Sequence, residues 1–318
     1  MKKAIFTGLG CMLCVFVYAA ADTVRLASPD GRTNVAVWYE NGLKYNVLHN
    51  GMPLLAASEI DMAVLDGGVR KRIGRIRAVS RRKVNERIPV PIPEKRRVVV
   101  NKCNELEICC RNNYVVRFRA YDDGVAYRIE TGFRDSVLVV GETARFNFPA
   151  MSHTYFPRIT CRADADVFHT AFEENYSCVR VDSLGPDAFG YLPVLVVPER
   201  GARIAVVESD LESYPGMFLK GCGGPSLEGV FAGYPLEWEQ TKGEYPDVIV
   251  TRRADYIVRV EGTRNFPWRI AVVAEEDRDL PGNDLVYRLA SPSRIGDTSW
   301  LHGIKGTDEW IPVSYTHL

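Results

Sequence analysis

Short runs of alternating apolar and polar residues, separated by turn residues, make up most of this chain. Residues 34–39 place apolar side chains at every second position, and Asn41-Gly42 then precedes another alternating run at residues 43–47. A repeat of two puts these apolar side chains on one face of a β-strand. Asn-Gly is a strong signal for a tight β-hairpin turn, and it occurs again at Asn50-Gly51. The pattern predicts consecutive antiparallel strands.

The same alternation continues toward the C-terminus. Residues 116–120 alternate and lead through Asp122-Asp123-Gly124 into another run at residues 125–130. Apolar residues at helical spacing are not sustained anywhere before Asp279. We therefore expect a mainly β fold, a large antiparallel β-sandwich of roughly 250 residues in one domain. Further strands are expected at residues 137–140, 191–197, 203–208, 248–251, 256–260 and 268–274.

The composition limits the possible partners. The chain has 318 residues, of which 46% are hydrophobic and 25% charged, so it can bury a large core. Lysine plus arginine equal aspartate plus glutamate at 40 each, so no overall field attracts nucleic acid or an anionic membrane. Neutral molecules are the expected ligands, and nucleic acid is not an expected partner.

Residues 1–21 have the organisation of a signal peptide, with a basic start, an apolar run and Ala19-Ala20-Ala21 at the end. We expect an exported, periplasmic protein that begins near Asp22. A membrane anchor is the alternative, but the run is short for a hydrocarbon core of about 30 Å, and no membrane span is expected after cleavage. Cys11 would suit a lipoprotein signal, although it lies early in the run.

Residues 67–97 contain twelve lysines and arginines against two glutamates. A nucleic-acid surface is one interpretation, but the segment lacks interleaved aromatic residues for base stacking. A solvated loop or edge strand is the other, in which positive charge prevents sheets from pairing edge to edge. The prolines at 89, 91 and 93 would end any strand there, and we favour this second interpretation.

Six cysteines follow the predicted signal peptide, and in an oxidising compartment some of them could pair. If Cys109 and Cys110 lie on a strand, they point to opposite faces. No cysteine or histidine spacing resembles a zinc site, so a zinc enzyme is not expected. Arg119, Arg128 and Asp122 fit a half-exposed sheet face and need no catalytic role.

Seven sequence blocks stand out in order along the chain, and they are residues 28–31, 50–55, 118–129, 208–217, 268–273, 283–289 and 293–300. Together they resemble the N-terminal domain of glycoside hydrolase family 97, which comprises exported bacterial α-glucosidases and α-galactosidases. The resemblance implies a β-supersandwich similar to galactose mutarotase, followed by a (β/α)8 barrel and a small β domain. Residues 22–290 would form the sandwich, and residues 291–318 the linker and the start of a barrel truncated here.

The resemblance also implies a calcium ion, held mainly by barrel carboxylates and by one glutamate from the sandwich. A hard cation of this kind prefers oxygen ligands. Glu208, where a buried strand is expected to emerge at a sheet edge, is the preferred match, and Glu173 is the second. The general acid and the base or nucleophile lie on the barrel in this family, so no catalytic residue is expected in this chain.

Tyr214, Tyr234 and Trp238 are the expected substrate-binding residues. They lie in the most acidic part of the chain, since residues 201–250 hold eight aspartates and glutamates against three lysines and arginines. Aromatic rings stack on the apolar faces of sugars, and carboxylates accept hydrogen bonds from sugar hydroxyls. Ordinary core and loop packing is the alternative for each ring.

The expected function is therefore that of the N-terminal domain of a calcium-dependent, exo-acting α-glucosidase or α-galactosidase, inactive without its barrel. One alternative is a stand-alone carbohydrate-binding module. Another is a mutarotase-like epimerase, for which His153 and His169 are the candidate histidines. The segment 311–318 does not resemble the family, and we interpret it as a cloning artefact or a broken reading frame.

Overall fold

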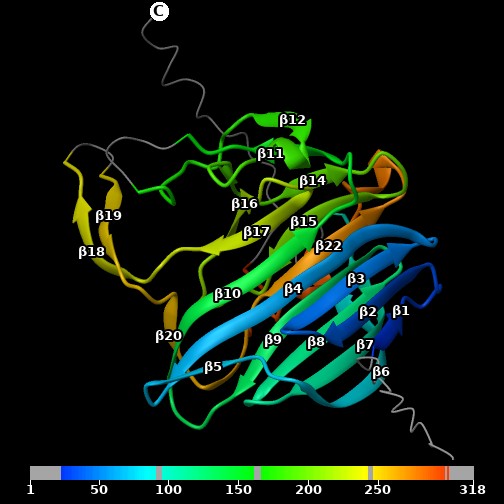
Figure 1. The fold of residues 1–318 in the computed structure, drawn as a ribbon, viewed down its shortest axis with the longest axis horizontal. Helices are drawn as coiled ribbons and strands as arrows, with labels where there is room; N and C mark the ends of the chain where they lie inside the picture. Colours follow the sequence, from blue (N-terminus) through cyan, green and yellow to red (C-terminus); the bar gives the residue numbers. More distant parts are fainter. Residues whose placement is uncertain (1–22, 91–94, 161–165, 243–245, 298, 301–318) are drawn as a thin grey trace, which may run out of the picture.

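The computed structural model describes residues 23–90, 95–160, 166–242, 246–297 and 299–300. Two ten-stranded antiparallel sheets face one another and enclose the main hydrophobic core (Figure 1). This confirms the predicted mainly β fold and its antiparallel pairing. Both the predicted signal peptide and the predicted start of a barrel lie largely outside the described residues. No helix in the described part is long and apolar enough to cross a membrane.

The first sheet has the order β1-β2-β3-β4-β10-β17-β16-β13, with β5 beside β4 and β20 beside β10. Its strands are β1 (Val24–Ala27), β2 (Thr33–Tyr39), β3 (Leu43–His49), β4 (Met52–Asp66), β5 (Val69–Arg72), β10 (Val137–Asn147), β13 (Phe189–Gly190), β16 (Met217–Gly221), β17 (Ser226–Phe231) and β20 (Val258–Val260).

The second sheet has the order β12-β11-β14-β15-β22-β9-β8-β7-β6, with β21 beside β9. Its strands are β6 (Ile76–Pro89), β7 (Val98–Cys110), β8 (Tyr114–Tyr121), β9 (Gly124–Gly132), β11 (His153–Pro157), β12 (Tyr176–Arg180), β14 (Val194–Val197), β15 (Arg203–Ser209), β21 (Thr263–Asn265) and β22 (Trp268–Ala274).

The predicted hairpin turns occur where the Asn-Gly pairs stand. Asn50 and Gly51 have φ values of 49° and 77°, and this left-handed conformation suits asparagine and glycine. Strands β2 and β3 pair across the first turn, at Asn41-Gly42, and strands β3 and β4 pair across the second, at Asn50-Gly51. The local turn chemistry therefore sets the order of β2, β3 and β4 in the first sheet.

Aromatic rings fill the centre of the space between the sheets. Tyr45 of the first sheet packs against Phe118 and Tyr127 of the second, with ring centroids 5.7 and 5.5 Å apart. Large inward-facing side chains of this kind contribute much of the apolar area that stabilises the sandwich.

A smaller apolar cluster lies on the outer face of the second sheet, beneath helix α1 (Leu285–Leu289). Leu285 and Leu289 pack there with Trp268. Gly124 permits this close approach, because a Cβ atom at that position would lie 2.4 Å from Leu285 Cδ1 and 2.7 Å from the carbonyl oxygen of Ala271. The helix therefore covers β15 and β22 and leads the chain away from the sheet.

Strand β6 is the outer strand of the second sheet, and most of its residues are exposed. It ends at Pro89, as the proline run predicted. Cys110 is buried, whereas Cys109 is partly exposed on the opposite face, which confirms the alternation expected there. In the described part of the chain, all five cysteines are free: Cys103, Cys109, Cys110, Cys178 and Cys222.

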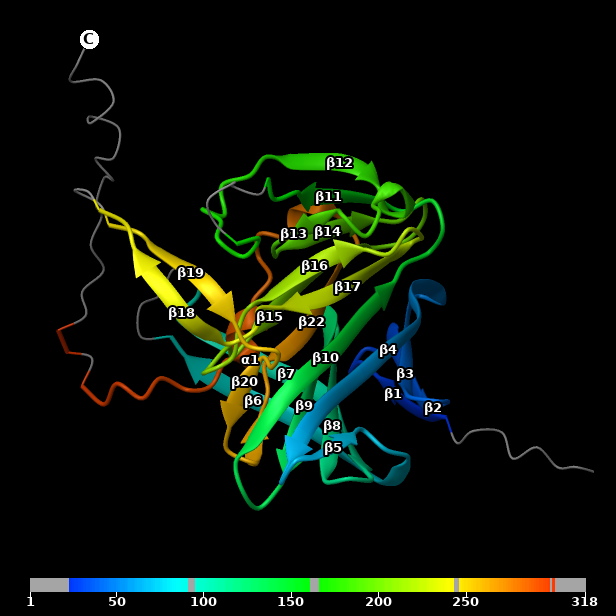
Figure 2. The ribbon, with the colours of Figure 1, turned by 60° about the vertical axis from the view of Figure 1, so that its left-hand side comes forward.

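A two-stranded hairpin of β18 (Pro235–Gln240) and β19 (Val248–Arg253) pairs with neither large sheet. Figure 2 shows it extending away from the sandwich. The remaining elements are two 3₁₀ turns, Val181–Ser183 and Asp277–Asp279. Within the described residues no α-helix precedes α1, as the sequence predicted.

Candidate functional site

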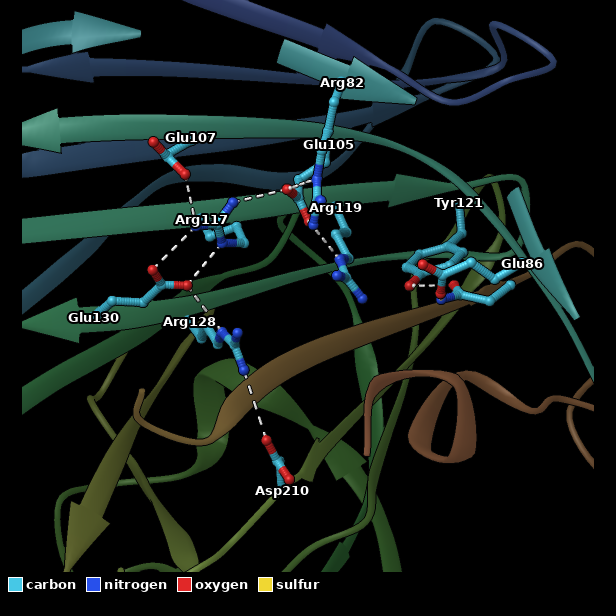
Figure 3. A network of polar contacts seen from close by, with 11 residues as sticks. Arg82, Glu86, Glu105, Glu107, Arg117, Arg119, Tyr121, Arg128, Glu130 and Asp210 are labelled. Atoms are coloured by element: carbon cyan, nitrogen blue, oxygen red, sulfur yellow. Dashed lines mark hydrogen bonds and ion pairs between the residues drawn. The ribbon is translucent and has the colours of Figure 1, made fainter. Parts of the chain in front are cut away.

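Charged side chains lie on the outer face of the second sheet, opposite the main core (Figure 3). Arg117 of β8 is at the centre of this network. Its Nη1 donates to Glu105 at 2.7 Å, and its Nη2 donates to Glu107 at 2.6 Å. Its Nε donates to Glu130 of β9 at 2.7 Å. Glu105 and Glu107 share a face of β7 because they are two residues apart. Arg117 contacts both of them and Glu130, and so joins the three neighbouring strands β7, β8 and β9.

Glu105 is the most buried carboxylate of this network, with 1% of its side chain exposed. Burial alone would raise its pKa, but hydrogen bonds from Arg82 and Arg119, with the charge of Arg117, outweigh burial and lower that pKa to about 2. The Nε atoms of Arg82 and Arg119 donate to Glu105 at 2.5 and 2.8 Å. Glu105 is therefore ionised at neutral pH.

A pocket of about 730 Å³ lies beside this network, next to α1. Arg119 and Arg128 both stack on the ring of Trp268, with their guanidinium carbons 5.0 and 4.6 Å from its centroid. Arg128 also reaches Asp210, with 3.6 Å between Nη1 and Oδ2 (Figure 3). The pocket lies at the place where the chain leaves the sandwich, and both charged and apolar side chains line it.

A second set of charges lies inside the sandwich. Arg269 of β22 donates from Nη1 to Glu208 at 2.6 Å and from Nε to Glu142 at 2.8 Å. The hydroxyl of Tyr214 donates to Glu142 at 2.8 Å. Glu142 belongs to β10 of the first sheet, so Arg269 links the two sheets.

The expectation that Glu208 faces a neighbouring domain is wrong, although the residue does lie next to the end of strand β15. Strand β15 lies between β14 and β22, and the alternation that buries Ile204 and Val206 also turns Glu208 inward. Its carboxylate accepts hydrogen bonds from Arg269 and from the amide of Met217, the latter at 3.0 Å. Burial raises the pKa of Glu208. Its role as a metal ligand stays a prediction, which this environment disfavours.

Glu173 has a different environment, on an exposed loop before β12. Within the described residues, its carboxylate makes no hydrogen bond or ion pair. The adjacent Phe172 has a φ of 59°, unusual for a bulky residue, and packs edge-on against Tyr191 with ring centroids 5.1 Å apart. Glu174, by contrast, accepts a hydrogen bond from the amide of Thr160 at 3.2 Å. Of the two candidate metal ligands, Glu173 is therefore the one whose carboxylate has no partner among the described residues.

The three predicted substrate-binding aromatics are not all in one environment. Tyr214 is buried and packs against Phe266 in the core, with centroids 5.4 Å apart. Tyr234 stacks on Tyr256 at 5.8 Å and remains half exposed. Trp238 of β18 is 60% exposed. Tyr234 and Trp238 could therefore contact a ligand without rearrangement, whereas Tyr214 could not.

The histidines of the epimerase alternative lie on different elements. His153 is an exposed residue of β11, and His169 contacts Asp247, with 2.9 Å between Nε2 and Oδ2. Among the residues that the structure covers, no three histidines, cysteines or carboxylates are grouped to hold a metal.

A family model described as the glycosyl-hydrolase 97 N-terminal domain matches residues 26–292. This chain belongs to glycoside hydrolase family 97. It is 34% identical over 314 residues to a retaining α-galactosidase from Bacteroides thetaiotaomicron. The aligned region covers 98% of this chain and 47% of that protein. The family 97 chain thus spans about half the length of this curated relative.

Solved structures share the fold of this family 97 domain. A family 97 enzyme from Pseudoalteromonas sp. strain K8, in complex with acarbose, matches with a TM-score of 0.71 at 20% identity, over 87% of this chain and 39% of that one. A β-arabinopyranosidase matches with a TM-score of 0.64 at 21% identity, over 79% and 40% of the two chains. At these identities the likeness shows the fold alone.

The sequence did not identify the charged network or the pocket of this family 97 domain. Alternation indicated that Arg119 and Arg128 face outward, but not that they stack on Trp268. Glu105, which holds Arg119, comes from the neighbouring strand β7, whereas Glu130, which holds Arg128, lies two residues away on β9. Charged residues at the outward-facing positions of consecutive strands were the sequence signal that could have predicted this network.

Proposed function

We propose that this chain is the N-terminal domain of an exported, exo-acting α-glycosidase that works with a separate catalytic domain. The observation that carries the proposal is the match of residues 26–292 to the family 97 N-terminal model, in a chain spanning 47% of a retaining α-galactosidase. The α-galactosidase is preferred over an α-glucosidase because the relative with that name is 34% identical. An exported location is supported by the leader-like residues 1–21.

Calcium is the proposed cofactor, and Glu173 is the residue of this domain that would bind it. Its carboxylate is exposed and has no partner among the described residues, as a ligand shared with another domain requires. Glu208 fits less well because Arg269 already neutralises it. When bound, calcium would polarise and position sugar hydroxyls and carboxylates for glycosidic cleavage.

Tyr234 and Trp238 are the proposed sugar-contacting side chains of this domain. Both are exposed, and Trp238 lies on a hairpin that extends from the sandwich (Figure 2). Exposed aromatic rings on such an extension suit contact with the apolar face of a sugar. In the proposed enzyme they would form one wall of a site whose acid and base belong to the other domain.

The test uses the longer protein encoded by the intact gene. It is expected to hydrolyse nitrophenyl α-galactoside, to lose activity with a calcium chelator and to regain it with added calcium. Glu173→Gln is expected to raise the calcium concentration needed for half activity at least tenfold, whereas Glu174→Gln should leave it unchanged. An active protein that is indifferent to the chelator and to Glu173→Gln would rule out the calcium assignment.

A stand-alone carbohydrate-binding module is the second candidate function. It is favoured by the exposure of Trp238 on the β18–β19 hairpin, which needs no catalytic domain to present it. Calorimetric titration of the 318-residue chain with maltose or galactobiose in chelator would measure this function. Saturable binding that Trp238→Ala abolishes would support the module, and no detectable heat would exclude it.

A further inference from the structure

The pocket on the outer face of the second sheet has a lining that the proposed function does not use. Its volume of about 730 Å³ lies in the usual range for small-molecule sites. Its acidic lining residues already have partners, since Glu86 accepts a hydrogen bond from Asn101 at 3.0 Å and Asp210 accepts one from the amide of Ser291 at 2.9 Å. Four arginines line the same pocket, and these are Arg87, Arg119, Arg128 and Arg288.

Two of these arginines are held in place by glutamates of the charged network. Arg119 donates from Nε to Glu105 at 2.8 Å, and Arg128 donates from Nε to Glu130 at 3.1 Å. Both also stack on Trp268. Figure 3 marks no contact at the outer nitrogens of Arg119, and one from Nη1 of Arg128 to Asp210, at 3.6 Å. Their Nη groups are therefore fixed donors beside the cavity, and such planar groups favour carboxylates.

Arg288 adds a donor whose hydrogen-bonding need is unmet. Its two Nη atoms donate to Asp123, but its buried Nε has no partner in the described structure. A buried donor of this kind usually has a bound group or an ordered water. Arg87, at the rim, is exposed and forms no ion pair with the described residues. Among the described residues, the pocket therefore has arginine nitrogens without an acidic partner at Arg87 and at the outer end of Arg119.

An aromatic surface lies beside these donors. Tyr287 of α1 lines the pocket and is 40% exposed. Its ring is available to stack on a flat, partly apolar ligand such as a sugar ring. A ligand that contacts both the arginines and Tyr287 must carry a carboxylate and a ring. A sugar acid carries both.

We propose that this pocket binds a uronic acid residue, with its carboxylate on the Nη groups of Arg119 and Arg128 and its ring against Tyr287. The carboxylate specificity rests on the arginines alone. The choice of a sugar as the rest of the ligand rests on the proposed function of the chain. This site lies on the sheet's outer face and shares no lining residue with the loop of Glu173 or the hairpin of Trp238.

Calorimetric titration of the 318-residue chain with galacturonate, galactose and propionate tests the proposal. Galacturonate is expected to bind, and to bind more weakly as salt increases, because the contact is ionic. Galactose and propionate are expected to bind at least tenfold more weakly, since each lacks one of the two recognised features. Equal affinity for galactose would overturn carboxylate recognition, and equal affinity for propionate would overturn sugar recognition.

Two variants locate the binding site. Arg128→Lys keeps the charge but not the planar fork, and it is expected to weaken galacturonate binding about tenfold. Tyr287→Ala, at an exposed position, is expected to weaken galacturonate binding but not propionate binding. Arg252→Lys on the exposed β19 strand is the matched control and should change neither. A thermal melt confirms that each variant is folded.

Unchanged galacturonate affinity in both folded variants, or no binding of any probe, would overturn the site. These outcomes are separate from the test of the proposed function, because that test measures hydrolysis by the longer protein. An inactive enzyme with an intact galacturonate site would refute the proposed function alone.

Discussion

Arg269 and Glu208 face each other on neighbouring strands and form an ion pair inside the sandwich, with 2.6 Å between Nη1 and Oε2. Glu142, from the opposite sheet, accepts two further hydrogen bonds from the same guanidinium, at 2.8 and 3.0 Å. Only 1% of the Arg269 side chain is exposed. One arginine therefore holds two buried carboxylates and connects the two sheets.

Arg269→Leu is expected to destabilise the domain strongly. It leaves Glu142 and Glu208 buried without their counter-ion, and breaking a buried pair in this way costs about 3–5 kcal/mol. Urea unfolding followed by fluorescence measures the change. Arg252→Leu, which removes an exposed arginine paired with Glu237, serves as the control and should change the stability far less. Equal effects of the two substitutions would show that the internal network is not important for stability.

Acid is expected to weaken the outer network through Glu105. Its pKa falls from 4.5 to about 2 on folding, so the unfolded chain binds the proton more readily. The resulting stabilisation is complete above pH 4.5 and is lost as the pH falls toward 2, with a size on the order of 2 kcal/mol. Urea midpoints at pH 3 and pH 6 should therefore differ more in the wild type than in Glu105→Gln. The same pH difference in both proteins would contradict this assignment.

Gly124→Ala is expected to displace α1 from the second sheet. The added Cβ would lie 2.4 Å from Leu285 Cδ1, and the φ of 158° lies in a range that favours glycine. We expect a loss of about 2 kcal/mol and earlier proteolysis near residues 285–289. Gly132→Ala is a suitable control, because nothing lies within 4 Å of its added Cβ. Similar melting temperatures of the two variants would show that α1 can shift without a loss of stability.

Thiol labelling should distinguish the cysteines of the folded chain. Cys178 is exposed on β12, whereas burial raises the pKa of Cys103 to about 11 and that of Cys110 to about 12. Because the thiolate is the reactive form, Cys178 should react first at pH 8, and the two buried thiols only after unfolding. Peptide mapping by mass spectrometry after brief iodoacetamide treatment checks this order. Early labelling of Cys103 would contradict the burial of β7.

Local pattern was sufficient to predict much of the strand layout. The run predicted at residues 268–274 is strand β22, and the run at 203–208 is β15 with one further residue. The run at 191–197 forms a shorter strand, Val194–Val197, which begins just after Pro193. These predictions succeed because alternation and turn residues act between neighbours in sequence.

The sequence alone therefore determined the antiparallel sandwich, its first hairpins and the absence of a helical pattern before Asp279. Only the tertiary structure decided which carboxylates are free and which are paired. The pattern at Glu208 could not reveal an arginine 61 residues away or a glutamate on the opposite sheet. The pocket beside Trp268 likewise combines β6, β8, β9 and α1. Side-chain partners brought together by sheet packing leave no signal in local periodicity, because their positions depend on the assembled layers.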